Sequence, residues 1–360
     1  MKKILLLLLI CFAQNLFAQE TFTYDDFRYT INENNEITII RYRGSLSSLD
    51  IPSVIDGKTV TTIGDEAFSD CDSLRSITIP DSVATIGGYA FNDCDLLTSI
   101  AIPNSVTTIG PNAFSNCDAL KSITIPNSVT TIGRCAFSGC DSLTNITIPD
   151  SVTIIDARAF LDCKSLTNIT IPNSVTTIGD EAFSNCDALK SITIPNSVTT
   201  IGEDAFSNCK SLTNIEISEN NETFTVIDNI LYDKKEKMLH TCFSKKTNIV
   251  IPNGILKINN SDFSNCDSLR SITIPNSVTT IGEYAFSGCR SLKSIIIPNS
   301  VTTIGEGAFY NCRSLKSITI PDSVISIGEY AFSNCKSLTN IEISENNETF
   351  TVIDNILYDK

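Results

Sequence analysis

The sequence is poor in the residues that carry most enzyme chemistry and metal binding. It has no tryptophan, two methionines and a single histidine, His240. A general acid or base acts with partners at fixed positions, and no second candidate recurs around this histidine. The sequence also lacks a glycine-rich phosphate loop, a metal-ligand cluster and a nucleophile motif. We therefore expect no enzyme activity, no cofactor and no metal, and we expect His240 to be an ordinary surface histidine.

Positive charge is also scarce. The chain has 26 lysines and arginines against 41 aspartates and glutamates, which gives a formal net charge of −15. Nucleic acids attract basic surfaces, so this balance argues against general nucleic-acid binding.

The N-terminus carries the one long hydrophobic run, in MKKILLLLLICFAQNLFAQ. Two lysines precede an apolar core of about ten residues, which is too short to span a bilayer. A small residue, Ala18, follows it. We interpret residues 1–18 as a secretory signal peptide cleaved near Ala18, and expect no transmembrane segment. A lipoprotein site at Cys11 is disfavoured because bulky Ile10 precedes it.

Internal repetition dominates the rest of the chain. The pattern L-x-x-I-x-I-P-x-x-V-x-x-I-G-x-x-A-F-x-x-C occurs in eleven copies. Its phenylalanine recurs every 23 residues in two runs, Phe68, Phe91, Phe114, Phe137, Phe160, Phe183 and Phe206, then Phe263, Phe286, Phe309 and Phe332. A fixed period of this length indicates a repeat solenoid, in which each copy forms one coil and packs on its neighbours.

The third copy predicts how one coil folds. The segment Ile123–Ile125 alternates with the period of a strand. Pro126 ends that strand because proline has no N–H to donate. Gly133 permits a bend. The apolar residues in 136–140 have the spacing of one helical turn, so each coil should contain a strand, a bend and a short turn.

The pattern IPxxVxxIGxxAFxxC resembles the BspA-like class of leucine-rich repeat, which is found in bacterial surface proteins and in some protozoan ones. The resemblance extends from about Leu49 to the C-terminus. It implies a right-handed coil of 23-residue repeats with a parallel β-sheet on one face and short turns or helical turns on the other. It also implies export or surface display, and adhesion or protein recognition without catalysis.

Two segments of the N-terminal half fall into distinct units. Residues 19–48 lack the repeat, and FRYTINENNEITIIRY alternates around a polar turn. This predicts an N-terminal β-hairpin that caps the first coil. The first block of the repeat array then covers residues 49–217.

An interruption at residues 218–248 separates the two blocks of the array. Within it, Phe224–Tyr232 and Met238–Phe243 are predicted strands around a charged turn, forming a protruding inserted β-hairpin. The second block covers residues 249–344. It begins with Asn259 and Asp262 in place of the usual glycine and alanine, so we expect this junction to be the weakest in the stack.

The last residues duplicate the interruption. Residues 331–360 are identical to residues 205–234. The sequence ends where the second half of the hairpin would begin, so residues 345–360 are expected to be an incomplete hairpin of a chain that was truncated or that continues. An anchor, a sorting signal or a further domain would lie in that missing part.

Fourteen cysteines would suggest disulfides in a secreted protein, but eleven of them share one repeat position, from Cys71 to Cys335. A column of buried free thiols is the simpler expectation, because cysteine fills core positions as a small hydrophobe. Disulfides between successive coils would need opposed Cβ vectors, and zinc would need ligand pairs that are absent. Cys135 stands outside the column and is expected to be exposed. Its redox state and that of Cys242 stay open.

The sheet face is the first candidate binding surface. The residue between the two strand isoleucines should point outward and form a stripe along the array. Its candidate binding residues are Thr124, Thr147, Thr170, Thr193, Thr273, Ile296 and Thr319. Threonine also simply suits exposed strand positions, so folding alone could account for the stripe.

Two basic columns are the second candidate. They are densest in the last coils and comprise Arg270, Lys293 and Lys316 in one column, with Arg290, Arg313 and Lys336 in the other. They could attract anionic glycans or acidic proteins, unless Glu283, Glu306 and Glu329 neutralise them.

These observations favour a secreted or cell-surface binding module that engages an extracellular, host-surface or matrix protein, or an anionic glycan. The alternative is a structural spacer that displays a missing C-terminal domain or anchor. The ligand, the organism and the oligomeric state stay open.

Overall fold

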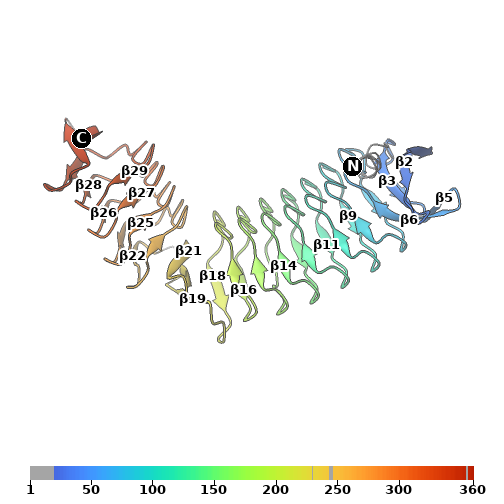
Figure 1. The fold of residues 1–360 in the computed structure, drawn as a ribbon, viewed down its shortest axis with the longest axis horizontal. Helices are drawn as coiled ribbons and strands as arrows, with labels where there is room; N and C mark the ends of the chain where they lie inside the picture. The colour runs from blue at the N-terminus through green and yellow to red at the C-terminus, as the bar shows by residue number, and fades with distance from the viewer. Residues whose placement is uncertain (1–19, 229, 243–245, 354–355) are drawn as a thin grey trace, which may run out of the picture.

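The computed structural model describes residues 20–360 apart from residues 229, 243–245 and 354–355. The predicted signal peptide lies outside the described residues. The chain forms an elongated solenoid of stacked coils with a bend near its middle (Figure 1). Throughout the described part it consists of strands and turns, without a helix.

The predicted I-x-I segments form parallel strands along one face of the coils. These strands are hydrogen-bonded in four separate groups, which together we call the wide sheet. Within a group, neighbouring strands pair in register, so that Ile123 lies opposite Ile146. Its strands are β4 (Ser48–Asp50), β7 (Ser76–Thr78), β9 (Ser99–Ala101), β11 (Ser122–Thr124), β13 (Asn145–Thr147), β16 (Ser191–Ile194), β18 (Asn214–Ile217), β22 (Asn248–Val250), β24 (Ser271–Thr273), β26 (Ser294–Ile296), β28 (Ser317–Ile320) and β30 (Asn340–Ile343).

A second row of parallel strands, which the sequence did not predict, runs beside it. These two-residue strands at the Thr-Ile steps are hydrogen-bonded in three separate groups, which together we call the narrow sheet. They are β8 (Thr85–Ile86), β10 (Thr108–Ile109), β12 (Thr131–Ile132), β14 (Ile154–Ile155), β15 (Thr177–Ile178), β17 (Thr200–Ile201), β23 (Lys257–Ile258), β25 (Thr280–Ile281), β27 (Thr303–Ile304) and β29 (Ser326–Ile327). The serine before the repeat valine links most coils further, as in Ser151, whose hydroxyl donates to the carbonyl of Val129 at 2.6 Å.

The predicted helical turn is instead a pair of tight turns with left-handed residues, at Cys135 (φ 53°) and Gly139 (φ 74°) in the third copy. The reason lies in the direction of the hydrogen bonds. The backbone N–H groups of Cys135, Phe137 and Gly139 donate to carbonyls of the next coil at 3.0, 2.9 and 2.8 Å. A helix would direct these donors along the chain, whereas here they join one coil to the next.

The core follows the predicted period but forms two spines, one in each block of the array, and not a single continuous one. The repeat phenylalanines stack ring on ring from Phe68 to Phe206 and from Phe263 to Phe332, with centroids of Phe137 and Phe160 5.6 Å apart and an interplanar angle of 8°. All of them are buried except the last, Phe332, which is partly buried. The leucine, valine and isoleucine positions of each coil pack around these stacks. Stacking therefore buries apolar faces that one coil alone would leave in water.

An antiparallel meander precedes the first coil. It consists of β1 (Phe22–Tyr24), β2 (Phe27–Ile31) and β3 (Ile37–Tyr42), and β3 runs parallel to β6 (Lys58–Ile63), which also pairs with β5 (Val54–Ile55). The ring of Tyr42 lies 5.6 Å from the ring of Phe68, at the end of the phenylalanine stack. The hydroxyl of Tyr29 donates to Asp56 at 2.5 Å, which raises the pKa of Tyr29 to about 12.

The interruption forms a second antiparallel meander, which also has three strands that pair in the order of the sequence. The predicted strand Phe224–Tyr232 is two strands, β19 (Phe224–Ile227) and β20 (Ile230–Asp233), which pair antiparallel. The strand β20 then pairs antiparallel with β21 (Met238–Cys242), and β21 runs parallel to β23. This insertion meander therefore continues the narrow sheet of the second block, in line with the stack.

The insertion meander divides the molecule into two arms with separate cores. Leu231 packs with the core of the first arm, while its neighbours Ile230 and Tyr232 pack with the core of the second arm. Successive side chains of a strand point to opposite faces, so β20 serves both cores at once. The bend in Figure 1 lies at this meander.

The C-terminal strands β31 (Phe350–Ile353) and β32 (Ile356–Asp359) pair like β19 and β20. Their identical sequences also make the same side-chain contacts. The buried Asn221 donates to the carbonyls of Pro195 and Val198, and the buried Asn347 donates to those of Pro321 and Val324. These asparagines fix the exit of the chain from a coil.

Candidate functional site

The predicted threonine stripe lies on the exposed side of the wide sheet, but its backbone support is uneven. Thr124 and Thr147 face each other on paired strands. Thr170 lies outside any strand, because on this face its coil pairs with the previous one only through a bridge between Asn145 and Asn168. The stripe is therefore exposed along its length and interrupted within the first arm.

The second arm gives this stripe an apolar character. Val250 on β22 lies beside Thr273 on β24, and Thr273 lies beside Ile296 on β26. The side chain of Val250 is 63% exposed and that of Ile296 is 81% exposed. The coil that carries Thr319 follows. This short run combines a threonine with two aliphatic side chains that the fold does not bury.

In each coil of the second arm, the residues of the two basic columns stand three and six positions before the outward-facing residue of the wide sheet. All six basic side chains are exposed. Within the described residues, their single ion pair joins Arg290 to Asp267 at 3.8 Å. Of the glutamates proposed to neutralise them, Glu306 accepts a hydrogen bond from the hydroxyl of Tyr284 instead. An exposed pair at this distance is worth little, so the positive charge stays available.

The cysteine column is a structural element. The thiol of Cys140 donates to the carbonyl of Phe114 in the preceding coil at 3.1 Å, and the same bond recurs along both arms, as from Cys289 to Phe263 at 3.0 Å. Burial raises the pKa of the Cys140 thiol to about 12. The described members of the column are free thiols, as predicted, and they are buried except Cys71, Cys209, Cys266 and Cys335, which are partly buried.

Cys135 and His240, which were both expected to be exposed, are instead partly buried. Cys135 is half-buried in an outer turn. His240 is not an ordinary surface histidine, because its ring packs edge-on against Phe224 with centroids 5.4 Å apart. Burial lowers the pKa of His240. The side chain of Cys242 lies outside the described residues.

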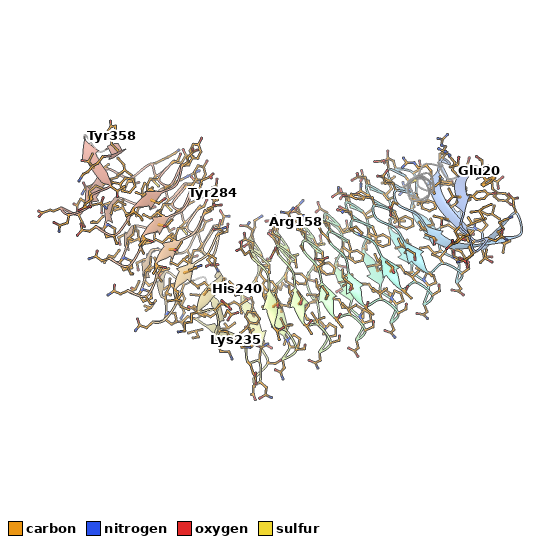
Figure 2. All side chains as sticks on the ribbon, viewed as in Figure 1. Glu20, Arg158, Lys235, His240, Tyr284 and Tyr358 are labelled. Carbon is orange, nitrogen blue, oxygen red and sulfur yellow. The ribbon has the colours of Figure 1, made fainter. Side chains whose placement is uncertain are left out.

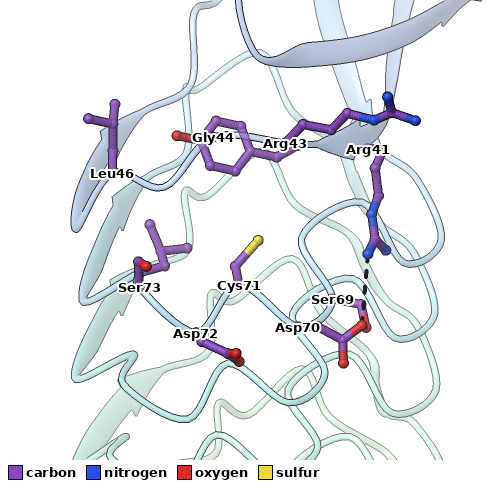
Figure 3. Close-up of a pocket in the computed structure, with 11 residues that line it drawn as sticks. Arg41, Arg43, Gly44, Leu46, Ser69, Asp70, Cys71, Asp72 and Ser73 are labelled. Atoms are coloured by element: carbon purple, nitrogen blue, oxygen red, sulfur yellow. Dashed lines mark hydrogen bonds and ion pairs between the residues drawn. The ribbon is translucent and has the colours of Figure 1, made fainter.

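A pocket of about 530 Å³ lies between the N-terminal meander and the first coil (Figure 3). Arg41 on one wall pairs with Asp70 on the other at 3.8 Å. Cys71, the first thiol of the column, borders the pocket. The interaction of its thiol with the neighbouring thiol of Cys94 lowers the pKa of Cys71, and the charge of Arg41 adds to this effect. The lining carries arginines on the meander side and aspartates on the coil side, so its charge favours neither anionic nor cationic ligands.

Neither catalysis nor metal binding gains support from the side chains. Among the described residues, no group of three or more histidine, cysteine or acidic side chains could hold a metal ion. In the same part of the chain, no helix has the length and apolar character needed to cross a membrane.

One further column, whose exposure varies from coil to coil, was not among the binding surfaces predicted from the sequence. It is the residue two positions before each repeat phenylalanine, which lies in an outer turn and varies in chemistry from coil to coil. We call it the outer-turn column. Its members are Glu66, Tyr89, Asn112, Cys135, Arg158, Glu181, Asp204, Ser261, Tyr284, Gly307 and Tyr330. Their variability amid near-identical repeats was the available signal.

Comparison with known proteins places this architecture. A solved structure of a leucine rich cell surface protein from Faecalibacterium prausnitzii has 32% sequence identity to the chain, covers 91% of this chain and 96% of that one, and gives a TM-score of 0.71. The pneumococcal vaccine antigen PcpA has 22% identity, with 94% of this chain and 86% of that one covered and a TM-score of 0.67, so it shares the fold. No protein with a curated description matches the chain.

The repeat itself identifies the family. Residues 38–164, 130–231 and 235–353 match the BspA type leucine rich repeat region. These ranges cover both arms and the insertion meander. The chain therefore belongs to the BspA-type leucine-rich repeat family, a binding-type scaffold found in bacterial surface proteins.

Proposed function

We propose that this protein is secreted or displayed at a cell surface, where it binds an extracellular or host-surface protein through the exposed side of the wide sheet. The observation that carries the proposal is Ile296, which is 81% exposed at the centre of the second arm. Transfer of such a side chain from water into an apolar contact contributes about 1.5–3 kcal/mol, and in the folded protein alone Ile296 stays in water. A partner that covers the sheet would gain it.

The basic columns extend the proposal to charge. Lys293 stands three residues before Ile296, and Arg290 stands three residues before Lys293. An acidic matrix protein or a sulfated glycan could contact these side chains while its less polar part covers the sheet. The predicted signal peptide and the surface proteins of the family support an extracellular location.

The variant Ile296→Thr tests the sheet face. It introduces the residue that most coils have at this position, so the fold should be retained. We expect binding to immobilised matrix proteins to weaken about tenfold, as the lost burial implies. The matched control is Ile325→Thr, because Ile325 is 65% exposed in the same arm, replaces the usual threonine and lies outside the wide sheet. Equal binding by both variants would refute the sheet as the binding face.

The double variant Arg290→Glu and Arg313→Glu tests the charge contribution. We expect weaker binding to heparin-like glycans and acidic proteins, with the difference disappearing at high salt because ions screen exposed charges. Unchanged binding to anionic ligands at low salt would remove the basic columns from the proposal.

A further inference from the structure

Each coil contains two residues with left-handed backbone, and the two columns they form follow different rules. The column just before the core cysteine contains only asparagine, aspartate and glycine. Its members are Asp70, Asp93, Asn116, Gly139, Asp162, Asn185, Asn208, Asn265, Gly288, Asn311 and Asn334. These residue types tolerate a positive φ best, so folding alone accounts for this column.

The outer-turn column has the same backbone conformation but a different composition. Tyr284 has φ 52° and Tyr330 has φ 57°, and tyrosine is a costly choice at such angles. Asn112 and Gly307 show that the cheaper residues also fit this position. Strained residues of this kind concentrate at functional sites. The turn also accepts Cys135 (φ 53°) and Arg158 (φ 60°), so the backbone angle does not decide which side chain a coil carries here, and the tyrosines have to be explained by what their side chains contact.

Core packing does not supply that explanation. The side chain of Tyr284 is 38% exposed and that of Tyr330 is 63% exposed. Figure 2 places Tyr284 and Arg158, which belongs to the same column, on the side toward which the two arms incline. Lys235 of the insertion meander lies on the opposite, outer side of the bend. The column thus lies on the inner side of the bend.

The local geometry holds the ring of Tyr284 in a defined orientation. Gly307 lies between Tyr284 and Tyr330 in the column, and a Cβ atom there would lie 2.4 Å from Cε1 of Tyr284. Glycine therefore leaves room for the Tyr284 ring to lie over the backbone. The hydroxyl of Tyr284 donates to Oε1 of Glu306 at 2.6 Å, which fixes the ring.

Acidic residues accompany the tyrosines. Glu283, Glu306 and Glu329 each stand directly before a member of the column, and the first arm has a glycine, Gly88, before Tyr89. No lysine or arginine occupies either position in the second arm. The surface is therefore aromatic and negatively charged.

The first arm contains an internal precedent for its ligand. The guanidinium of Arg158 lies 2.6 Å from Oε1 of Glu181, the next member of the same column. The spacing of two coils thus accommodates a cationic side chain beside a carboxylate.

We propose that Tyr284, Gly307 and Tyr330, with Glu283, Glu306 and Glu329, form a docking surface for a lysine- or arginine-bearing segment of another protein. The cationic groups would lie over the tyrosine rings, whose faces are electron-rich, and beside the carboxylates. This surface is separate from the wide sheet and selects the opposite charge from the basic columns. It would stand even if the sheet bound nothing.

The chain itself permits a selective binding assay. Because it has no tryptophan, a lysine-rich peptide with one tryptophan can be followed by its own fluorescence. We expect this peptide to bind, and a glutamate-rich peptide of equal length not to bind. The double variant Tyr284→Asn and Tyr330→Asn should weaken binding about fivefold or more, as expected for the loss of two exposed cation–π contacts. Glu306→Gln should also weaken it.

The asparagine variants protect the test against misfolding, since Asn112 occupies the same column naturally. The matched control is Tyr89→Asn, which removes a 45% exposed tyrosine from the same turn of the first arm, where glycine replaces the glutamate. A loss equal to that of the double variant would overturn the proposal. The proposal would also be refuted if a neutral oligosaccharide competed with the lysine-rich peptide and the variant Glu306→Gln bound the peptide normally. Self-association that Arg290→Glu abolishes would instead assign the surface to a second copy.

Discussion

The backbone N–H of Asn259 donates to the carboxylate of Asp262, with 2.6 Å between N and Oδ2. In the first coil of the first arm, the equivalent Gly64 donates its N–H to the carbonyl of Ile39 in the meander. At the second junction the side chain of Asn259 donates to the carbonyl of Leu239 instead. The two unusual residues thus act together. The side chain of Asn259 bonds to the insertion meander, and Asp262 accepts the backbone N–H of Asn259, which would otherwise donate to the meander as that of Gly64 does.

This solution places a carboxylate inside the junction. Asp262 is 3% exposed and lies near Asp204 and Glu203 of the first arm, and burial raises its pKa well above the ordinary value. A hydrogen bond between the side chains of Asn265 and Asn208, at 2.7 Å, also joins the two arms here.

The variant Asp262→Asn should therefore change how stability depends on pH. A carboxyl group whose pKa is raised in the folded state contributes stability that is present below its unfolded pKa and lost as pH rises through the folded pKa. Asparagine keeps an acceptor for Asn259 and cannot ionise. At pH 7 we therefore expect the variant to have a larger unfolding free energy than the wild type, and we expect this difference to disappear at pH values below the ordinary aspartate pKa.

Denaturant titrations across pH 4–8 would measure this effect, with Asp267→Asn as an exposed control from the same coil. A wild-type stability that does not fall with rising pH relative to Asp262→Asn would contradict the assignment.

The two cores predict that unfolding occurs in two transitions. Ile230 and Leu231 are adjacent on β20 and fully buried, but they belong to different cores. Replacing either by alanine should cost about 2–5 kcal/mol. We expect Ile230→Ala to shift only the transition of the second arm and Leu231→Ala only that of the first. Hydrogen exchange would assign each transition, and a single transition shifted by both variants would show that the arms unfold as one unit.

The duplicated segment provides a test of context. Asn221 and Asn347 have the same sequence neighbours and equivalent hydrogen bonds, including donors from residues 223–224 and 349–350. Alanine at either position leaves several buried groups unpaired, at about 1–3 kcal/mol for each group. We expect Asn221→Ala to be the more damaging, because β20 also supports the second arm. Equal losses in thermal unfolding would mean that the junction adds nothing.

The thiols should react in two classes. Cys140 is buried, is hydrogen-bonded and has its pKa raised to about 12, whereas Cys135 is half-buried in the outer turn. The thiolate is the reactive form, so alkylation of the folded protein near pH 8 should label Cys135 well before Cys140. Peptide mass mapping would measure this, with Cys135→Ser as the control. Labelling of Cys140 at the rate of Cys135 in folded protein would contradict the hydrogen-bonded column.

The candidate surfaces differ in how far sequence alone could predict them. The threonine stripe and the basic columns follow from the period, because a residue between two inward-facing strand positions must point outward. The outer-turn column has no such pattern. Its importance depends on the backbone angle of Tyr284 and on the space that Gly307 leaves for the ring, and neither is readable from residue spacing.

The sequence by itself determined the 23-residue coil, the identity of the core residues such as Phe137 and Cys140, and the place where the array is interrupted. Each is a local, repeated property, since hydrophobic spacing selects which side chains face inward. Only the tertiary structure decided that residues 136–140 form tight turns, that β20 faces two cores, and that Asp262 is buried at the bend. These features depend on hydrogen bonds and packing between coils, where the partner of each group lies a full repeat or more away along the chain.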